Sequence, residues 1–584
     1  MKNMKIGVAC SPGLAVEKAY ILREPEIPAD LGSIQPDQVE QELGKLNGAL
    51  EKSIGQIEDI YRKALQTAGT EEAKIFEAHR MILEDPIFRE GMENAIKDCL
   101  LTAGHAIAKT AEEQAAVFES IDDAYLRERA ADIRDIGNRL LYNALGIEIK
   151  DVSSLNESVI LVAHDITPSL MATIDREHVK GILAEVGGAT AHTAILARNM
   201  EIPAVLGASG ILSMIKDGET LILDGGKGEV EINPDEAKIA QAYEKIEKTA
   251  RIKKELRLIK DIESRTKDGR RIELAANIGV PSDTGKVLEY GADGIGLFRT
   301  EFLYMDRICA PCEEEQFEAY KKVLRDLDGK PVIIRTLDVG GDKEIPCLNM
   351  EREDNPFLGY RAIRICLDDT ELFKTQLRAI LRASVYGNEL IMFPMISNVE
   401  EVVKAKKIME EAKAELERKG QEYAPDVKVG IMVEIPSTAV AADLFVDHVD
   451  FFSIGTNDLT QYILAVDRGN TRVSHLYNCF HPALIRLLKN VVEASESRKG
   501  VFTGMCGEMA GNPLATLLLV GLGFTELSMS PGSILKVKKI ITSVDTAYAK
   551  RVAEHVLGLA SAEEIEAYLK GELKALGLDY LLEL

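Results

Sequence analysis

The sequence predicts a multidomain α/β protein: an α/β domain with an inserted α-helical bundle, followed by a C-terminal (β/α)8 TIM-type barrel. A chain of 584 residues is long enough for about three or four domains of ordinary size. From Val39 to Leu65, apolar residues recur every three or four positions, which is typical of a long amphipathic helix. Between about 271 and 530, eight strand-like runs alternate with helical segments, as in a parallel barrel.

The first domain is predicted to be interrupted. Residues 5–20 have the pattern of a short strand, a Ser11-Pro12-Gly13 turn and a second strand, and strand-like runs resume only at Val159. Further helical stretches are predicted around 72–83, 87–118 and 121–145. We therefore expect an α/β domain made of residues 1–21 and 145–230, with a helical bundle of residues 22–144 inserted in it.

The remaining chain divides into a linker and the barrel. Residues 231–262 are charged and favour helix, so they are predicted to form a linker helix, and residues 263–584 the barrel domain. The predicted barrel strands are Ile272–Asn277, Gly294–Phe298, Val332–Leu337, Leu390–Pro394, Val429–Val433, Phe451–Ile454, Val501–Met505 and Glu526–Met529.

Charge and hydropathy exclude several classes of partner. The formal net charge of −25 argues against nucleic acid and anionic membranes, although it permits a basic protein partner. The longest apolar run, Leu514–Phe524, is shorter than the roughly 20 residues of a membrane span, so no membrane insertion is expected. The Ser11-Pro12-Gly13 turn cuts short the apolar run at the start, which argues against a signal peptide.

The eight cysteines are scattered, which fits reduced thiols and a cytoplasmic location better than a disulfide framework. Cys309 and Cys312 have C-x-x-C spacing with no second pair nearby. Zinc or redox use is one interpretation of this pair, and coincidence in a loop is the favoured one.

Polar residues gather at the carboxyl ends of the predicted barrel strands. Because active sites of this barrel form at that face, several strands delivering charged groups there indicate a site rather than packing. In chain order these residues are Arg299, Arg335, Glu434, Asn457, Asp458, Arg468 and Cys506.

The residue types indicate the ligand. The three arginines offer planar donors to phosphate and carboxylate oxygens, and Asn457 can bond to phosphate without adding charge. Glu434 and Asp458 are oxygen ligands of the kind that hold Mg²⁺ together with phosphate oxygens and water. We therefore expect a small molecule with both a phosphate and a carboxylate, bound through a divalent metal. Cys506 is either a weak acid that passes a proton to carbon or a small apolar filler.

A second candidate site lies at Gly187-Gly188-Ala189-Thr190-Ala191-His192-Thr193. Glycines let the backbone approach an anion, and the predicted helix start offers N–H groups to it. His192 could attack a phosphoryl group there and then carry it. A packed or capping histidine is the alternative for this residue taken alone.

Nearly end to end, the chain resembles Enzyme I of the bacterial sugar phosphotransferase system, the phosphoenolpyruvate–protein phosphotransferase family. No single motif is specific, but together they are. The motifs that carry the resemblance are Ser11–Gly13, Ile75–His79, Tyr125–Asp132, Gly187–His192, Gly296–Phe302, Arg335–Lys343, Asn355–Arg361, Gly430–Glu434, Gly455–Tyr462, Gly504–Glu508 and Ser528–Gly532.

The resemblance implies a phosphoryl relay that begins sugar uptake and phosphorylation. Phosphoenolpyruvate would bind the barrel rim through Arg299, Arg335, Asn457, Asp458 and Arg468, with Mg²⁺ on Glu434 and Asp458. His192 would accept the phosphoryl group and pass it to a histidine of the carrier protein HPr. Cys506 would protonate the enolate to give pyruvate. The family also implies that the helical block docks HPr and that the barrel forms a homodimer.

The surroundings of His192 differ from the family pattern, and its position has a consequence for the mechanism. Ala189 and Ala191 stand where the family usually has Arg and Ser, so a cation and a hydroxyl beside the histidine are missing. His192 and the barrel rim lie in different predicted domains, so we expect a large domain rotation with hinges near 230–262 and 145–155. His79 is interpreted as a helix-surface histidine, with contact to the carrier as the alternative.

Two other functions compete with this one. A pyruvate phosphate dikinase-like enzyme shares the chemistry but needs a nucleotide-grasping domain; the chain has no phosphate-binding P-loop motif, and its helical block is too short for that domain. A phosphoenolpyruvate-sensing regulatory paralogue without efficient relay is the second alternative, supported by Ala189 and Ala191.

Overall fold

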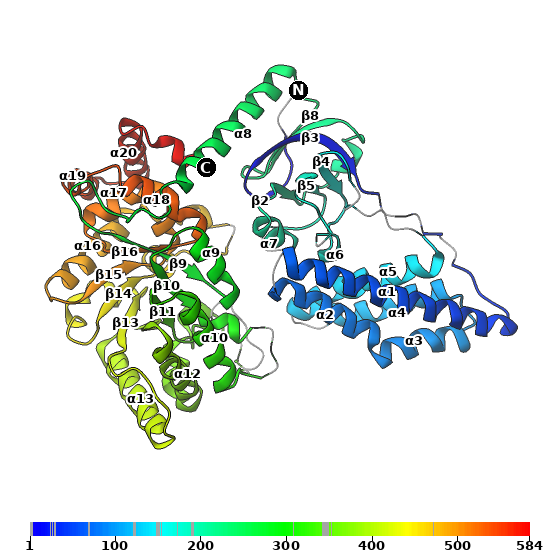
Figure 1. The fold of residues 1–584 in the computed structure, drawn as a ribbon, viewed down its shortest axis with the longest axis horizontal. Helices are drawn as coiled ribbons and strands as arrows, with labels where there is room; N and C mark the ends of the chain where they lie inside the picture. The colour runs from blue at the N-terminus through cyan, green and yellow to red at the C-terminus, as the bar shows by residue number, and fades with distance from the viewer. Residues whose placement is uncertain are drawn as a thin grey trace. The chain divides into compact units, whose positions relative to one another are not determined.

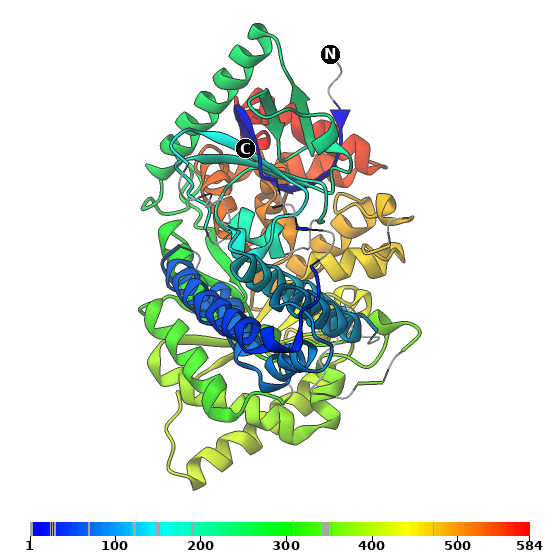
Figure 2. The same ribbon diagram turned by 90° about the vertical axis from the view of Figure 1, so that its right-hand side faces the viewer.

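The computed structural model describes residues 4–23, 25, 27–28, 31–67, 70–120, 124–147, 152, 155–171, 173–188, 192–305, 307, 309–340, 348, 350–351, 353–470 and 472–584. The chain forms two compact units, Met1–Ala250 and Arg251–Leu584. Figures 1 and 2 show the elements of both units.

The first unit contains an eight-stranded mixed sheet in the order β1-β8-β7-β3-β4-β5-β6-β2. Parallel pairs join β3 to β4, β4 to β5 and β5 to β6, and the other pairs are antiparallel. Buried apolar side chains cover both faces of the sheet. The strands are β1 Met4–Lys5, β2 Val8–Ser11, β3 Leu14–Ile21, β4 Val159–Ala163, β5 Val179–Ala184, β6 Ala204–Leu206, β7 Thr220–Asp224 and β8 Glu229–Ile232.

Two short helices of the first unit, α6 (Pro168–Met171) and α7 (His192–Asn199), follow β4 and β5 in the chain. Because the sheet takes strands from both ends of the unit, one α/β domain is interrupted by a helical insertion, as the sequence predicts.

The inserted block consists of helices packed around their own apolar core (Figure 1). They are α1 Val39–Thr67, α2 Thr70–Glu84, α3 Pro86–Lys97, α4 Ala103–Ser120 and α5 Ala124–Leu145. The single helical stretch predicted over 87–118 is wrong, because α3 ends at Lys97 and α4 begins at Ala103. Leu100 has a positive φ of 52° between them, and Leu101 forms a β-bridge with Ser33, so the helix cannot continue.

His79 does not lie on a helix surface, contrary to the prediction. It is fully buried, its ring packs edge-on against Phe76 at 5.8 Å between centroids, and Nε2 lies 3.4 Å from Asp132 Oδ1. A side chain held in the core of the block in this way is a packing residue rather than a docking residue.

Helix α8 (Glu236–Arg257) joins the two units along the chain, within the segment predicted as a linker helix. In its first half, Tyr243 Oη donates a hydrogen bond to the carbonyl of Val16 at 3.2 Å. In its second half, Ile252 and Leu256 belong to the hydrophobic core of the second unit.

The second unit is built on a closed barrel of eight parallel strands (Figure 1). Eight parallel pairings close the barrel from β9 through β16 and back to β9, and Arg299 pairs with Arg335 at the last positions of β10 and β11. The strands are β9 Glu273–Ile278, β10 Gly294–Arg299, β11 Pro331–Arg335, β12 Asn388–Phe393, β13 Lys428–Val433, β14 Phe451–Ile454, β15 Phe502–Met505 and β16 Glu526–Met529.

All eight predicted barrel strands are confirmed, with ends that differ by at most two residues. Helices surround the barrel and bury a large apolar core against it, whereas a smaller cluster fills its interior. The helices are α9 Thr284–Glu289, α10 Glu313–Asp326, α11 Ile363–Asp368, α12 Thr370–Ala383, α13 Val399–Arg418, α14 Pro436–Val440, α15 Thr456–Leu464, α16 Pro482–Glu496, α17 Pro513–Leu522, α18 Ile534–Ile541, α19 Thr546–Leu557 and α20 Ala562–Ala575.

In the described part of the chain, no helix has both the length and the apolar character that crossing a bilayer requires.

Candidate active site

The barrel brings the predicted rim residues to the carboxyl ends of its strands. Arg299 and Arg335 are the last residues of β10 and β11, and Glu434 directly follows β13. Asn457 and Asp458 lie in the first turn of α15, which follows β14. Because the strands of a closed parallel barrel all point the same way, these side chains share one rim.

Arg335 is held by two carboxylates. Its Nη2 lies 2.7 Å from Glu301 Oε1, its Nη1 lies 2.7 Å from Asp338 Oδ2, and the residue is only 5% exposed. Burial by itself lowers the pKa of the guanidinium, but the charges of Asp338 and Glu301 outweigh it and leave the pKa above its ordinary value. Arg335 is therefore a fixed cation with a fixed orientation.

A second buried arginine, Arg361, belongs to the same cluster, although sequence reasoning assigns it no role. Its Nη2 lies 2.9 Å from Asp338 Oδ1 and 3.6 Å from Asp458 Oδ2. Arg361, Asp338 and Glu301 all fall within the sequence motifs quoted above, but only the fold shows that they pair with predicted site residues. Their position in those motifs was the available signal.

Asp458 lies between two arginines, because Arg468 Nη2 approaches its Oδ1 at 3.6 Å. This second distance is too long for a hydrogen bond, and Oδ1 has no hydrogen-bond partner among the described residues. Arg468 is about one-third exposed. Asp458 Oδ1 is therefore a buried oxygen with capacity for a further ligand.

Glu434 is a buried carboxylate in the middle of this charge cluster. It is 1% exposed, and its Oε1 accepts a hydrogen bond from the Met395 amide at 2.6 Å. Burial and the neighbouring charges of Asp338 and Asp458 raise the pKa of Glu434 to about 8, against the opposing effect of Arg335 and Arg361. A divalent cation would relieve this repulsion, so the carboxylates present fit such an ion.

Two carboxylates do not complete a metal shell. Within the described ranges, no group of three or more His, Cys, Asp or Glu side chains is arranged to hold a metal ion. Mg²⁺ usually takes one or two carboxylates and completes its shell with substrate phosphate oxygens and water. Glu434 and Asp458 fit that pattern rather than a cage made only of protein ligands.

Asn457 and Arg299 add polar groups to the rim. Asn457 Oδ1 accepts from the Glu508 amide at 3.0 Å, which fixes the orientation of its side-chain amide. Arg299 has no ion-pair partner in the parts of the chain that the structure describes. A cation without a carboxylate partner at the rim is suited to an anionic ligand.

Cys506 is a buried thiol of the barrel interior. It directly follows β15, is 4% exposed, and packs with Leu297 and Met432 in the barrel interior. Burial raises the pKa of its thiol to about 12, so the sulfur carries a proton at neutral pH. Its Sγ lies 3.8 Å from the Ile454 carbonyl, which accepts that proton in a weak hydrogen bond.

The phosphoryl-acceptor candidate, His192, is the first residue of α7 in the other unit. The next residue is anchored, because Thr193 Oγ1 donates to the Ile166 carbonyl at 2.6 Å. Gly187 has a φ of +106°, a conformation that favours glycine in the approach to the helix. The side chain of His192 and the substituted positions Ala189 and Ala191 lie outside what the structure describes.

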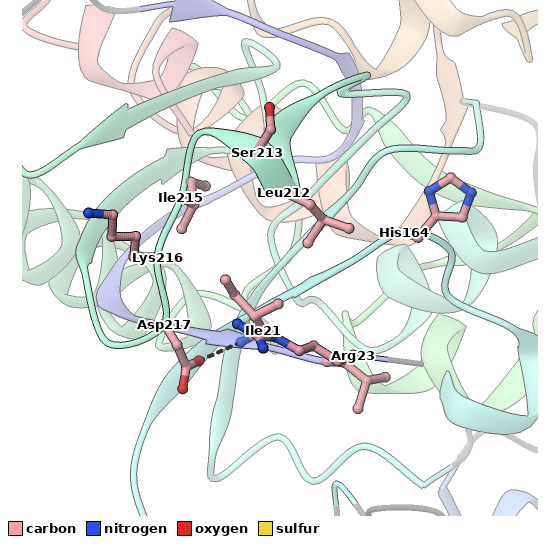
Figure 3. A pocket seen from close by; sticks show the side chains of 9 residues that line it. Ile21, Arg23, His164, Leu212, Ser213, Ile215, Lys216 and Asp217 are labelled. Atoms are coloured by element: carbon pink, nitrogen blue, oxygen red, sulfur yellow. Dashed lines mark hydrogen bonds between the residues drawn. The ribbon is translucent and has the colours of Figure 1, made fainter. Parts of the chain in front are cut away.

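A cavity on the first unit contains none of the predicted site residues (Figure 3). It measures about 530 Å³ and is lined by Ile21, Leu22, Arg23, His164, Leu212, Ser213, Ile215, Lys216 and Asp217. Asp217 Oδ1 accepts from the Ile21 amide at 2.8 Å, and His164 Nδ1 lies 2.8 Å from Glu185 Oε2. Its charged groups are paired or exposed, so we do not place the reaction there.

Three family models match the chain. They are described as "PEP-utilising enzyme, N-terminal" over residues 6–129, "PEP-utilising enzyme, mobile domain" over 155–228, and "PEP-utilising enzyme, PEP-binding domain" over 253–546. His192 falls within the second of these segments. The seven predicted rim residues fall within the third.

Curated relatives match over nearly the whole length. A protein of Staphylococcus carnosus (strain TM300) is 49% identical over 559 residues, which cover 96% of this chain and 97% of the relative. One from Priestia megaterium is 47% identical over 564 residues, covering 97% and 98% respectively. Both relatives bear the name phosphoenolpyruvate-protein phosphotransferase.

Proposed function

Because the chain belongs to the phosphoenolpyruvate-protein phosphotransferase family, we propose that its barrel rim binds phosphoenolpyruvate and that His192 receives the phosphoryl group. The chain is accordingly a transferase that uses phosphoenolpyruvate as the phosphoryl donor. The cluster of Arg335, Arg361, Asp338, Asp458 and Glu434 carries the proposal, because it combines fixed cations with carboxylates at one rim.

The arginines supply the anion-binding part of the site. Arg299, Arg335 and Arg468 bind the phosphate and carboxylate oxygens of the substrate, and the oriented amide of Asn457 donates to the phosphate. The ion pairs of Arg335 with Glu301 and Asp338 hold its guanidinium in place before the substrate arrives. Such preorganised charge favours transition states in which negative charge shifts between oxygens.

We propose Glu434 and Asp458 as the residues that hold Mg²⁺. A bound cation of this kind neutralises part of the charge on the transferring group. The support is the buried Glu434 carboxylate beside two further carboxylates and the open Oδ1 of Asp458.

The proposed reaction transfers first the phosphoryl group and then a proton. The P–O bond of phosphoenolpyruvate breaks, an N–P bond forms at one imidazole nitrogen of His192, and the electron pair of the broken bond remains on the enolate oxygen. Cys506 gives its thiol proton to the methylene carbon of the enolate, which yields pyruvate, and solvent returns a proton to the sulfur. The neutral, buried thiol supports this role.

We further propose the small carrier protein HPr as the acceptor from His192 and the helical block, residues 22–144, as its docking domain. Residues 1–21 with 145–230 would form the phosphohistidine domain, 231–262 the linker and 263–584 the barrel domain. The strand composition of the sheet and the three matched segments support these boundaries. Because His192 and the rim belong to different units, the relay requires the units to move during turnover.

A homodimer through the barrel is a separate proposal. Val440 and Leu444, four residues apart on the second unit, are 63% and 62% exposed, so both apolar side chains are available for a contact. If they lie in the dimer interface, Leu444→Asp will shift the chain toward monomer in sedimentation equilibrium. An unchanged mass for this variant would exclude that interface.

The first experiment is incubation with phosphoenolpyruvate and Mg²⁺, followed by intact-mass measurement under alkaline conditions. We expect one added phosphoryl group in the native chain and in a matched His178→Ala variant of the same unit, and none in His192→Ala. The adduct should disappear when HPr is added. A folded native chain with no adduct would refute the relay and favour the phosphoenolpyruvate-sensing alternative.

A further inference from the structure

The C-x-x-C pair has no role in the proposed reaction, yet it lies in a connection that begins at the rim of the candidate site. Cys309 and Cys312 are both exposed, in the connection that leads from the end of β10 to α10. That connection starts from the substrate-facing rim, because Arg299 is the last residue of β10. The pair is therefore accessible from solvent and lies on the barrel face that holds the candidate site.

Cys312 is also built into the start of α10. It is the N-cap residue of the helix, and its amide donates to Glu315 Oε2 at 2.8 Å. Arg307 Nη1 pairs with the other oxygen of the same carboxylate at 2.9 Å. A change in the backbone at Cys312 would thus be transmitted to the first turn of α10.

Between the two cysteines, Pro311 connects the loop to a buried polar network. The Pro311 carbonyl accepts from Gln316 Nε2 at 3.0 Å. Gln316 is fully buried, and its Oε1 accepts from the hydroxyls of Tyr304 at 3.2 Å and Tyr320 at 3.1 Å. Every one of these groups is excluded from water, so a lost partner would leave an unsatisfied polar atom.

The network continues to the strand end that carries Arg335. Gln376 Nε2 donates to Tyr320 Oη at 3.3 Å and to Thr300 Oγ1 at 3.1 Å. Thr300 Oγ1 in turn donates to the Arg335 carbonyl at 2.8 Å. The Leu337 amide donates to Gln376 Oε1 at 2.8 Å, so the chain of bonds contacts the backbone on both sides of residue 336.

We propose that Cys309 and Cys312 form a thiol–disulfide couple, and that closing the disulfide lowers the phosphoenolpyruvate-dependent activity of the barrel site. A disulfide brings its two α-carbons to within about 4.4–6.8 Å. For residues three apart this requires a tight turn, which reorients the Pro311 carbonyl between them. Gln316 then loses its acceptor, and the change reaches Thr300 and Arg335 through the buried hydrogen bonds.

The oxidant is a low-molecular-weight disulfide. One cysteine thiolate attacks it, forming a mixed disulfide and releasing one small thiolate. The second cysteine thiolate attacks the mixed disulfide, forming the Cys309–Cys312 bond and releasing the second small thiolate. The two cysteines are oxidised, the reagent is reduced to two thiols, and the two cysteine protons end on those thiols. A dithiol such as dithiothreitol reverses the reaction.

Disulfide formation is tested by mass, independently of activity. The full-length chain is treated with oxidised glutathione, the remaining thiols are alkylated, and the chain is digested with trypsin. Both cysteines lie between Arg307 and Lys321, so one peptide should escape alkylation and lose two hydrogens relative to the reduced form. Recovery of both cysteines fully alkylated, or of either one joined to another peptide, would overturn the proposal.

The effect on activity is tested in the same samples. We expect oxidation to lower kcat/KM for phosphoenolpyruvate by roughly two- to thirtyfold, the range usual for coupling through packed networks, with full recovery in dithiothreitol. Cys309→Ser and Cys312→Ser should keep the reduced-state activity and lose the sensitivity; serine is itself a good N-cap at position 312. Cys99→Ser, which removes an exposed cysteine of the first unit, and Cys347→Ser should both remain sensitive.

The activity readout rests on the proposed function, whereas the mass readout does not. A reduced native chain without activity would refute the proposed function. An active reduced chain that forms the disulfide with unchanged kcat/KM would refute the redox control. Equal inhibition of Cys309→Ser by oxidised glutathione would also refute it, because the inhibition would then come from another thiol.

Discussion

Arg361 Nη2 lies 2.9 Å from Asp338 Oδ1, in an ion pair of which both side chains are only 3% exposed. The same guanidinium reaches Asp458, and Asp338 also holds Arg335. The pair therefore joins a proposed metal ligand to a proposed substrate arginine. The two residues that this ion pair contacts, Arg335 and Asp458, lie at or just after the ends of different strands, β11 and β14. The charges at the rim therefore form one connected cluster.

Arg361→Met should damage both stability and activity. Removal of Arg361 leaves the buried negative charge of Asp338 with less positive charge beside it. For a typical buried pair this lowers the free energy of unfolding by about 3–5 kcal/mol. We expect a lower denaturation midpoint in urea and a lower kcat/KM for phosphoenolpyruvate. Arg364→Met is the matched control, because Arg364 on α11 donates, among the described residues, only to the nearby Leu358 and Gly359 carbonyls. Equal behaviour of the two variants would contradict the role of the cluster.

Cys506→Ala should slow the proton transfer selectively. General acid catalysis typically contributes about 10²–10⁴-fold to a rate. The rate at which the methyl protons of pyruvate exchange with deuterated solvent should therefore fall by about 10²-fold or more. Phosphorylation of the chain should be affected less than this exchange. Cys479→Ala is the control, since burial also raises the pKa of the Cys479 thiol, to about 11, in the same unit. Unaltered exchange in Cys506→Ala would leave the cysteine as a packing residue only.

Glu434→Gln should weaken metal binding at the site and leave the fold intact. We expect the Mg²⁺ concentration for half-maximal activity to rise by roughly tenfold or more, because a charged oxygen ligand is lost. Titration of activity against Mg²⁺ measures this. Glu389→Gln is matched, because burial also raises the pKa of Glu389 well above its ordinary value, and it lies near the start of β12. The same Mg²⁺ dependence in both variants would argue against Glu434 as a ligand.

Glu526 predicts a pH-dependent stability. Its carboxylate is buried at the start of β16, and neither oxygen has a hydrogen-bond partner among the described residues. Gly296 and Gly504 leave room for it: an added Cβ would lie 2.1 Å and 2.3 Å from its oxygens. Burial, helped by Glu273, raises the pKa of Glu526 to about 8.

The sign follows from this raised pKa. Between the ordinary pKa of 4.5 and the folded-state pKa of about 8, the folded chain keeps a proton on Glu526 that the unfolded chain releases. The contribution of the protonated Glu526 to folding stability is therefore full below pH 4.5 and is lost as the pH rises through 8. Glu526→Gln should therefore gain roughly 2–4 kcal/mol relative to the native chain between pH 5 and 9, measured by urea unfolding. The exposed-site variant Glu371→Gln should show no such trend. A pH-independent difference would contradict the buried neutral carboxyl.

The barrel was predictable from sequence because its strands are buried on both faces. The run Phe451–Ile454 is nearly continuous in apolar residues and is bounded by helical segments, and the structure reproduces this range. The helix break near Leu100 was not predictable in the same way. It depends on a positive φ and on a bridge to Ser33, far away in the chain.

The candidate site was predictable only in part. Polar residues after strands mark the rim, which is how Arg335 and Glu434 were found. Their partners were not found, because Glu301 and Arg361 reach them through the fold and not through any sequence spacing. Sequence patterns locate side chains on elements, whereas ion pairs depend on how loops from different strands converge.

The interrupted sheet affects the order of folding while the chain is synthesised on the ribosome. Strand β3 pairs with β4 and β7, and about 140 residues separate its last residue, Ile21, from Val159. At a synthesis rate of about 5–20 residues per second, β3 waits roughly 7–28 s for its first partner. Helices α1–α5 need only local contacts and can fold within that time. The inserted block is thus expected to fold before the domain that it interrupts. The sheet then forms in a chain whose helical block is already folded.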